Sequence, residues 1–104
     1  MTRTILCSLD EMPAGTARRF DVGDRRLALV RIENDVYVVN DECSHEDYSL
    51  AEGEVFVEER EIECWKHGST FSLETGDPQS LPATQPIAVY TAGVEDGQIW
   101  VELS

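Results

Sequence analysis

The spacing of the cysteines and histidines restricts the fold of this chain more than any other feature. Cys43 and His45 form a C-x-H pair, and Cys64 and His67 form a C-x-x-H pair after the eighteen residues 46–63. The two pairs use both histidines and two of the three cysteines. Because thiolates and imidazoles are typical metal ligands, we expect the fold to bring these two separated segments to one metal centre.

Strand signals dominate the rest of the sequence, and long amphipathic helical periods are missing. Asn34-Asp35 and Asp96-Gly97 are hairpin turn signals, and Gly76-Asp77-Pro78 marks a further turn. Many short strands at close spacing predict an all-β fold, an antiparallel sandwich or barrel-like domain. The segments that read as strands are residues 4–9, 25–33, 35–40, 54–59 and 60–64, a short strand early in 70–79, and two more within 87–103.

Each cysteine–histidine pair is expected on a loop just after a strand, in "VYVVN-DE-CSH" and "EIE-CWKHG". Loops at adjacent strand ends can converge on one site, with the β scaffold fixing their separation. Two thiolates and two imidazoles suit tetrahedral zinc, but a zinc finger groups like ligands together. Here each loop supplies one of each, which also suits a two-iron cluster whose cysteines bind one iron and whose histidines bind the other.

The length of 104 residues is enough for one domain with a modest core. A net charge of −13 argues against nucleic acid and anionic membranes as partners. No apolar run approaches the roughly 20 residues of a membrane span, and the start, "MTRTILCSLDEMPAG", lacks the pattern of a secretory signal. The expected compartment is therefore the cytoplasm, where reducing conditions favour metal binding by cysteines over disulfides.

The charge is distributed unevenly along the chain. Ten carboxylates and a single basic residue, Arg60, lie between Asp41 and Glu63, whereas five of the eight basic residues lie between Arg18 and Arg31. A surface that resists aggregation explains this distribution. So does an acidic rim around the metal centre that steers a basic partner toward it, and the two interpretations are compatible.

"CSH" followed by "CWKHG" resembles the two-box motif of Rieske [2Fe–2S] proteins, and the surrounding sequence is similar to the small soluble Rieske ferredoxins of bacteria. The resemblance implies a single Rieske domain over residues 1–104, with an antiparallel base and a small cluster-binding part over about 41–84 formed by the two loops. It implies one [2Fe–2S] cluster, with the cysteines on the inner iron and the histidines on the outer iron: Cys43 and Cys64, His45 and His67. The connection between the boxes is slightly longer than the family's, which predicts a longer hairpin around "EVFVEEREIE".

Other residues near the boxes have weaker interpretations. Gly68 is expected to allow a tight turn that brings amides toward the sulfides. Trp65 either shields the cluster or packs in the protein, and we favour packing; Trp100 reads as core. Pro82 either caps the cluster, as the third loop of the family does, or is a turn proline. Cys7 lies in an apolar strand and is expected to be a buried, inert thiol.

The same resemblance predicts a low reduction potential. High-potential members carry an extra cysteine in each box that pair as a disulfide, and the corresponding positions here are Tyr48 and Lys66. Those members also place a serine and a tyrosine after the second box, whose hydroxyls bond to the cluster. This chain has Ser69 but carries Phe71 in place of the tyrosine. Fewer donors and many carboxylates both disfavour added negative charge.

The resemblance implies an electron carrier and no enzyme, since both histidines are committed and none remains for a catalytic mononuclear iron site. The expected partners are a flavin-dependent reductase as donor and a terminal oxygenase as acceptor. Alternatives are the small Rieske subunit of an assimilatory nitrite reductase and an accessory protein of iron–sulfur cluster assembly. A structural zinc module and a redox sensor remain as different classes.

Overall fold

The computed structural model describes residues 2–42, 49–65, 68–79 and 85–103, and within them the chain forms three antiparallel sheets. The predicted all-β architecture is confirmed. The helices in the described residues are two short 3-10 turns, and neither is long and apolar enough to cross a membrane. The elements are β1 Thr2–Ser8, η1 Leu9–Glu11, β2 Thr16–Val22, β3 Arg25–Ile32, β4 Asp35–Asn40, η2 Leu50–Glu52, β5 Val55–Phe56, β6 Glu61–Glu63, β7 Thr70–Ser72, β8 Val89–Tyr90, β9 Ala92–Glu95 and β10 Gln98–Leu103.

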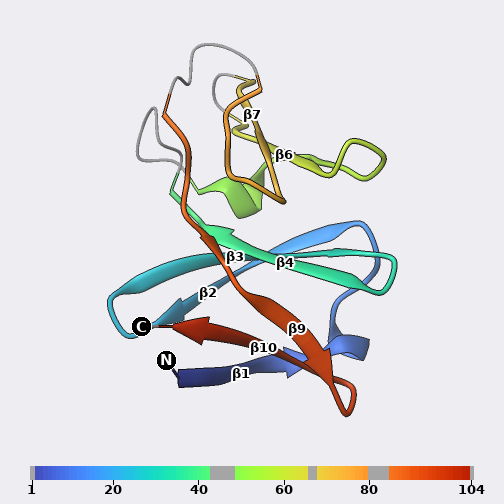
Figure 1. Ribbon diagram of the computed structural model, residues 1–104. Coiled ribbons are helices and arrows are strands. Elements are labelled where there is room, and N and C mark those ends of the chain that lie inside the picture. The colour runs from blue at the N-terminus through green and yellow to red at the C-terminus, as the bar shows by residue number, and fades with distance from the viewer. Residues whose placement is uncertain (1, 43–48, 66–67, 80–84, 104) are drawn as a thin grey trace.

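The sheet β2-β3-β4-β8 is the middle layer of the molecule, between the sheet β1-β10-β9 and the small sheet β5-β6-β7 (Figure 1). The run 27–30 of β3 is fully buried, because successive side chains point to opposite faces and both faces are covered. Leu27 and Leu29 join the core against β10, while Ala28 and Val30 join the core that reaches the small sheet. One strand therefore contributes to both hydrophobic cores.

The two predicted hairpin turns have different outcomes. Asp96 and Gly97 connect β9 to β10 with φ of +53° and +76°, and this prediction is confirmed. The turn between β3 and β4 lies one residue earlier than predicted, because Ile32 pairs with Asp35 and leaves Glu33 and Asn34 as the loop. Glu33 takes a φ of +54°, so a glutamate occupies the left-handed position.

The remaining strand predictions are partly wrong. The 54–59 segment is a strand only at Val55–Phe56, because residues 57–60 turn the chain back into β6 and Arg60 takes a φ of +55°. The predicted hairpin around "EVFVEEREIE" is nevertheless present, since β5 pairs antiparallel with β6. Sequence reasoning missed β2, whose "TARRFDV" carries too many charges for a strand pattern but pairs with β3 over its full length.

The small sheet is an insertion between two paired strands. The chain leaves the base at the end of β4 and returns in β8, where Val38 pairs with Tyr90 and Val39 with Val89. η2, β5, β6 and β7 all lie between these two points and stand on the middle sheet (Figure 1). The two ends of the ligand-bearing insertion therefore lie side by side on the base.

Candidate metal centre

The second cysteine–histidine segment forms a closed loop between β6 and β7. The amide of Cys64 donates to the carbonyl oxygen of Ser69 at 2.7 Å, and the amide of Gly68 donates to the carbonyl oxygen of Cys64 at 2.9 Å. Gly68 has a φ of +75°, which a residue with a side chain rarely adopts. The tight turn expected at Gly68 is present, whereas its role of bringing amides toward the sulfides stays a prediction.

The side chain of Cys64 is fully buried on an apolar floor. Leu50, Ile62 and Phe71 belong to the same hydrophobic cluster, and each is fully buried. Ser69 is also fully buried, in the turn that follows the box. Low water access around a thiolate ligand lowers the local dielectric constant and thereby tunes the potential of a bound metal centre, so this environment fits a buried sulfur ligand.

A buried carboxylate, Asp41, joins the two ends of the first cysteine–histidine segment. Its Oδ2 accepts a hydrogen bond from the Ser49 hydroxyl at 2.6 Å, and its Oδ1 accepts one from the Ala51 amide at 2.9 Å. The Asp41 carbonyl oxygen accepts from the Leu50 amide, and Glu42 forms an isolated β-bridge with Ser49. Sequence reasoning counted Asp41 only as one acidic residue among ten, because its partners are eight to ten positions away and form no local motif.

Gly53 brings the two ligand-bearing segments into direct backbone contact. A Cβ built on Gly53 would lie 1.6 Å from the carbonyl oxygen of Glu63, the residue before Cys64. The adjacent amide of Glu63 donates to the carbonyl oxygen of Glu54 at 2.9 Å. The chain that follows the first box therefore lies against the strand that leads into the second box, and only glycine fits there.

The segment after β7 reverses as the Gly-Asp-Pro signal predicted. The Ser72 amide donates to the carbonyl oxygen of Asp77 at 2.9 Å, and the Gln79 amide donates to that of Thr70 at 2.7 Å. Gly76 has a φ of +82° and contacts the carbonyl oxygen of Ile87, where a Cβ would lie at 2.1 Å. This turn places the start of the third loop beside β7.

The described residues include only part of the predicted site. Cys64, Gly68, Ser69 and Phe71 lie together at the β6–β7 turn and in the core below it. No group of three potential ligands occurs within the described ranges, which hold a single one of the four predicted ligands. Cys43, His45, His67 and Pro82 lie outside the described residues, as do Tyr48 and Lys66.

Neither tryptophan is a core residue, so both packing expectations are wrong. Trp65 lies in the turn directly after the buried Cys64 and is 48% exposed. Trp100 alternates with the buried Ile99 and Val101 and lies on the outer face of β10, where the Arg3 guanidinium stacks 3.9 Å from its ring centroid.

Cys7 lies in β1, on the other side of the middle sheet from Cys64. Its side chain is partly buried against the core formed by Leu27, Leu29 and β10, rather than fully buried as expected. Burial, with a further contribution from the negative charge of Glu11, raises the pKa of the Cys7 thiol above its ordinary value. Cys7 therefore belongs to the core on the side of the middle sheet away from the ligand-bearing insertion.

Replacing Cys7 by serine is expected to leave the visible spectrum and the iron content unchanged. The reason is that the thiol packs against the core on the far side of the middle sheet from Cys64. Absorption spectroscopy and metal analysis of the purified Cys7→Ser protein check this result. Bleaching of the variant would contradict the ligand assignment.

Charges that are separate in the sequence are partly mixed in space. Arg19 donates to Asp21 at 3.0 Å and lies 3.8 Å from Asp41, and the hydrogen bond and ion pair with Asp21 hold the pKa of Arg19 above its ordinary value. Arg60 donates to the Tyr37 hydroxyl and, at 3.1 Å, to Asp35, which raises the pKa of Arg60. Exposed carboxylates of the insertion lie on η2 and around the β5–β6 hairpin, among them Glu52, Glu54, Glu58 and Glu59.

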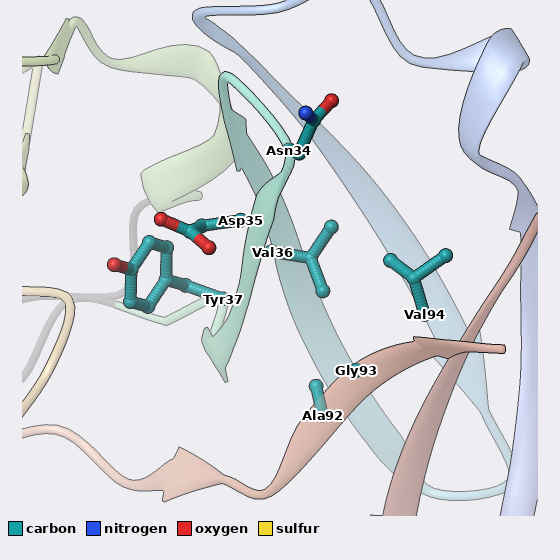
Figure 2. A pocket seen from close by; sticks show the side chains of 7 residues that line it. All are labelled: Asn34, Asp35, Val36, Tyr37, Ala92, Gly93 and Val94. Carbon is teal, nitrogen blue, oxygen red and sulfur yellow. The ribbon is translucent and has the colours of Figure 1, made fainter.

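Two hollows lie in the base. One, of about 420 Å³, opens where β4 continues past β8 and faces β9, between Val36 and Val94 (Figure 2). Asn34 and Asp35 line it from the end of β4 opposite Asp41. A second hollow of about 440 Å³ places Arg25 and Arg26 next to Glu42, at the start of the first loop. Both hollows are lined largely by polar groups and strand backbone, unlike the apolar pockets that hold small-molecule substrates.

The three antiparallel sheets and the closed loop around Cys64 agree with the class of protein that the two cysteine–histidine pairs predict. The model of the Rieske [2Fe-2S] domain family matches residues 2–91, and the chain belongs to this family. The predicted resemblance is confirmed.

Proteins with similar sequences or structures include the ferredoxins of dioxygenase systems. The chain is 36% identical, over 99% of its length and 95% of the relative, to the 3-phenylpropionate/cinnamic acid dioxygenase ferredoxin subunit of Escherichia coli strain K12. The ferredoxin of carbazole 1,9a-dioxygenase from Nocardioides aromaticivorans IC177 matches with a TM-score of 0.93 and 33% identity, covering 97% of both chains. A ferredoxin of Sphingomonas yanoikuyae B1 matches with a TM-score of 0.89 and 25% identity, covering 99% of this chain and 100% of that one. Small subunits of nitrite reductases, at 23% and 21% identity, share the fold.

Proposed function

We propose that this chain is the ferredoxin component of a ring-hydroxylating dioxygenase system and carries single electrons from a flavin-dependent reductase to a terminal oxygenase. The observation that carries the proposal is the match to the Rieske family over residues 2–91, a range that includes both cysteine–histidine boxes. The relatives at 33% and 36% identity are dioxygenase ferredoxins, which favours this role over that of a nitrite reductase subunit. The chain itself is a carrier and performs no catalysis on the organic substrate.

The ligands we propose for one [2Fe–2S] cluster are Cys43 and Cys64 on one iron and His45 and His67 on the other. The buried thiol position of Cys64, the closed turn at Gly68 and the apolar floor suit a sulfur ligand shielded from water. When bound, the cluster supplies a one-electron redox couple. The protein's own contribution is to hold the two boxes at fixed loop ends and to limit water access from the β6–β7 side.

We place the cluster-binding part at about 41–84 of a single domain spanning 1–104. The insertion between β4 and β8 supports these limits, because its ends meet on the base. We also propose a cytoplasmic location, where reducing conditions keep cysteines available as ligands.

The exposed carboxylates on η2 and the β5–β6 hairpin support steering of a positively charged partner. Glu52 on η2 and Glu58 in the β5–β6 turn are both exposed. Charge steering raises the association rate and gives weak complexes that separate quickly, as a carrier requires. A carbazole 1,9a-dioxygenase oxygenase has been captured in complex with its ferredoxin, a chain 36% identical to this one. A terminal oxygenase is accordingly the acceptor that we propose.

The test combines composition with electron transfer. Protein isolated without air is assayed for iron and acid-labile sulfide, reduced, examined by electron paramagnetic resonance (EPR), and mixed with an oxygenase component under rapid-mixing conditions. We expect a His-ligated two-iron signal and oxygenase reduction that slows as salt rises. Zinc without sulfide would establish a structural module instead. Partner affinity that depends strongly on oxidation state, without electron transfer, would identify a sensor.

The reduction potential is expected near the low end of the Rieske range of roughly −150 to +300 mV. The sequence lacks the cysteine pair that forms the disulfide of high-potential members, and Phe71, buried in the same cluster as Cys64, has no hydroxyl to donate. Potentiometric titration followed by visible absorption or circular dichroism gives the midpoint. A value above about +100 mV, well inside that range, would contradict the prediction.

A further inference from the structure

Asp41 has an unusual environment for a carboxylate of a small domain. It is 1% exposed although it is the first residue after β4. A buried carboxylate is stable only when its oxygens are hydrogen-bonded or paired with a positive charge. Both conditions are met here, since Ser49 and Ala51 donate to separate oxygens and the Arg19 guanidinium lies 3.8 Å away.

The backbone of Asp41 is anchored as firmly as its side chain. Its amide donates to the carbonyl oxygen of Arg26 on β3 at 2.9 Å, and its carbonyl oxygen accepts from Leu50. The side chain of Leu50 in turn is fully buried in the cluster that contains Cys64. Asp41 thus links the end of the base sheet, the start of η2 and the floor of the second ligand loop.

These contacts fix both ends of one segment. Asp41 precedes the predicted ligands Cys43 and His45, and its hydrogen-bond partners Ser49 and Ala51 follow them. A ligand loop whose ends are already tied loses less conformational entropy when it binds a metal. Groups that orient ligands without binding the metal are a general requirement of metal sites.

We propose that Asp41 is a positioning residue for the metal centre: its carboxylate clamps residues 49–51 to the end of β4 and so sets the geometry of the loop that carries Cys43 and His45. This inference rests on the proposed ligand set. Asp41 is not one of the four proposed ligands, and its two oxygens accept hydrogen bonds from Ser49 and Ala51.

Four variants test the clamp. Asp41→Ala removes both acceptors, Asp41→Asn keeps the volume but loses the charge, and Ser49→Ala removes one donor. Asp21→Asn is the matched control, because Asp21 pairs with the same Arg19 but is exposed and takes no part in the hydrogen bonds from Ser49 and Ala51 to Asp41. Because Asp41→Asn and Ser49→Ala create no large cavity, they keep the proposal testable if Asp41→Ala does not fold.

Three readouts separate positioning from general stability: the EPR line shape of the reduced cluster, the rate of iron loss to a chelator, and hydrogen exchange at the Ala51 amide. A hydrogen bond to a charged group corresponds to roughly a 10- to 100-fold change in an equilibrium constant. We therefore expect Asp41→Ala to lose iron at least about tenfold faster, by the same relation, with altered EPR and faster exchange at Ala51. Asp41→Asn and Ser49→Ala should change in the same direction by less. The effects of these two changes combined in one protein should be less than additive, because the two residues share one contact.

The proposal would be overturned if the folded Asp41 and Ser49 variants showed the same EPR line shape, rate of iron loss and Ala51 amide exchange as the wild-type protein. Equal changes in Asp21→Asn would overturn it too, because those would trace the effect to Arg19. A wild-type protein without any cluster is a different result. It would remove the proposed function and with it the metal-positioning role, whereas Ala51 exchange in the same proteins would still report whether the clamp closes the loop.

Discussion

Cys64→Ser protein is expected to emerge from purification colourless, without acid-labile sulfide and without an EPR signal after reduction. The thiolate is the form that binds iron, and a serine hydroxyl stays protonated near neutral pH and is a hard ligand ill-suited to an iron–sulfur cluster. Cys64 is fully buried on an apolar floor, so no other side chain of the described residues around it offers a sulfur donor. We expect iron and sulfide to fall below about a tenth of the wild-type content. Loss of a group that only supports a ligand typically lowers metal affinity about 10- to 100-fold, and loss of the ligand itself should lower it at least as much.

The Cys7→Ser protein is the matched control for this result, because it carries the same chemical change in β1. Its colour should match that of the wild type, since Cys7 is packed into the opposite core. Iron and sulfide analysis, visible circular dichroism and far-ultraviolet circular dichroism together distinguish loss of the cluster from loss of the fold. A Cys64→Ser protein that keeps a His-ligated two-iron signal would remove Cys64 from the ligand set.

Gly53→Ala is expected to be the most disruptive of the single-methyl additions. Its Cβ would lie 1.6 Å from the carbonyl oxygen of Glu63 and 2.8 Å from the carbonyl carbon, both backbone atoms that cannot move aside like a side chain. The segment that follows the first box would have to separate from the strand before Cys64. Overpacking of this kind costs about 3 kcal/mol, and we expect reduced cluster content in addition.

Gly23→Ala is the control for Gly53→Ala. Gly23 has a φ of +59° in the turn between β2 and β3, and nothing lies within 4 Å of the position that an added methyl group would take, so the cost there is backbone strain of about 1 kcal/mol. Denaturant unfolding of the cluster-free proteins gives both values, and iron analysis gives the occupancy. Equal losses of unfolding free energy in Gly53→Ala and Gly23→Ala, or a wild-type iron content in Gly53→Ala, would contradict the prediction. Either result would show that close contact between Gly53 and Glu63 is not required.

The features that sequence reasoning predicted well are those encoded within a few residues. The β3 run is apolar on both faces, Asp96-Gly97 supports two successive positive φ values, and Gly68 follows the second box. The family motif indicated the candidate ligands for the same reason, since each box is short and its residue types are rare in this chain.

The features that it missed depend on contacts between distant segments. Nothing near Asp41 indicates that Ser49 and Ala51 will bury its carboxylate, and nothing near Gly53 indicates the approach of Glu63. The strand β2 was missed because Arg18, Arg19 and Asp21 interrupt its apolar pattern, and Asp41, a further partner of Arg19, is distant in the sequence. Trp100 was assigned to the core by residue type, whereas its strand position places it on the outer face.

The pairing of β4 with β8 makes the upper part of the molecule a cassette. Because Val39 and Val89 are partners, the base already holds together the two points where the cassette is attached, whatever the length of chain between them. Extra residues can extend the β5–β6 tip without shifting the register of the base (Figure 1). Grafting the cassette of another carrier onto these two strands is thus a direct route to exchanging redox and docking properties on one scaffold.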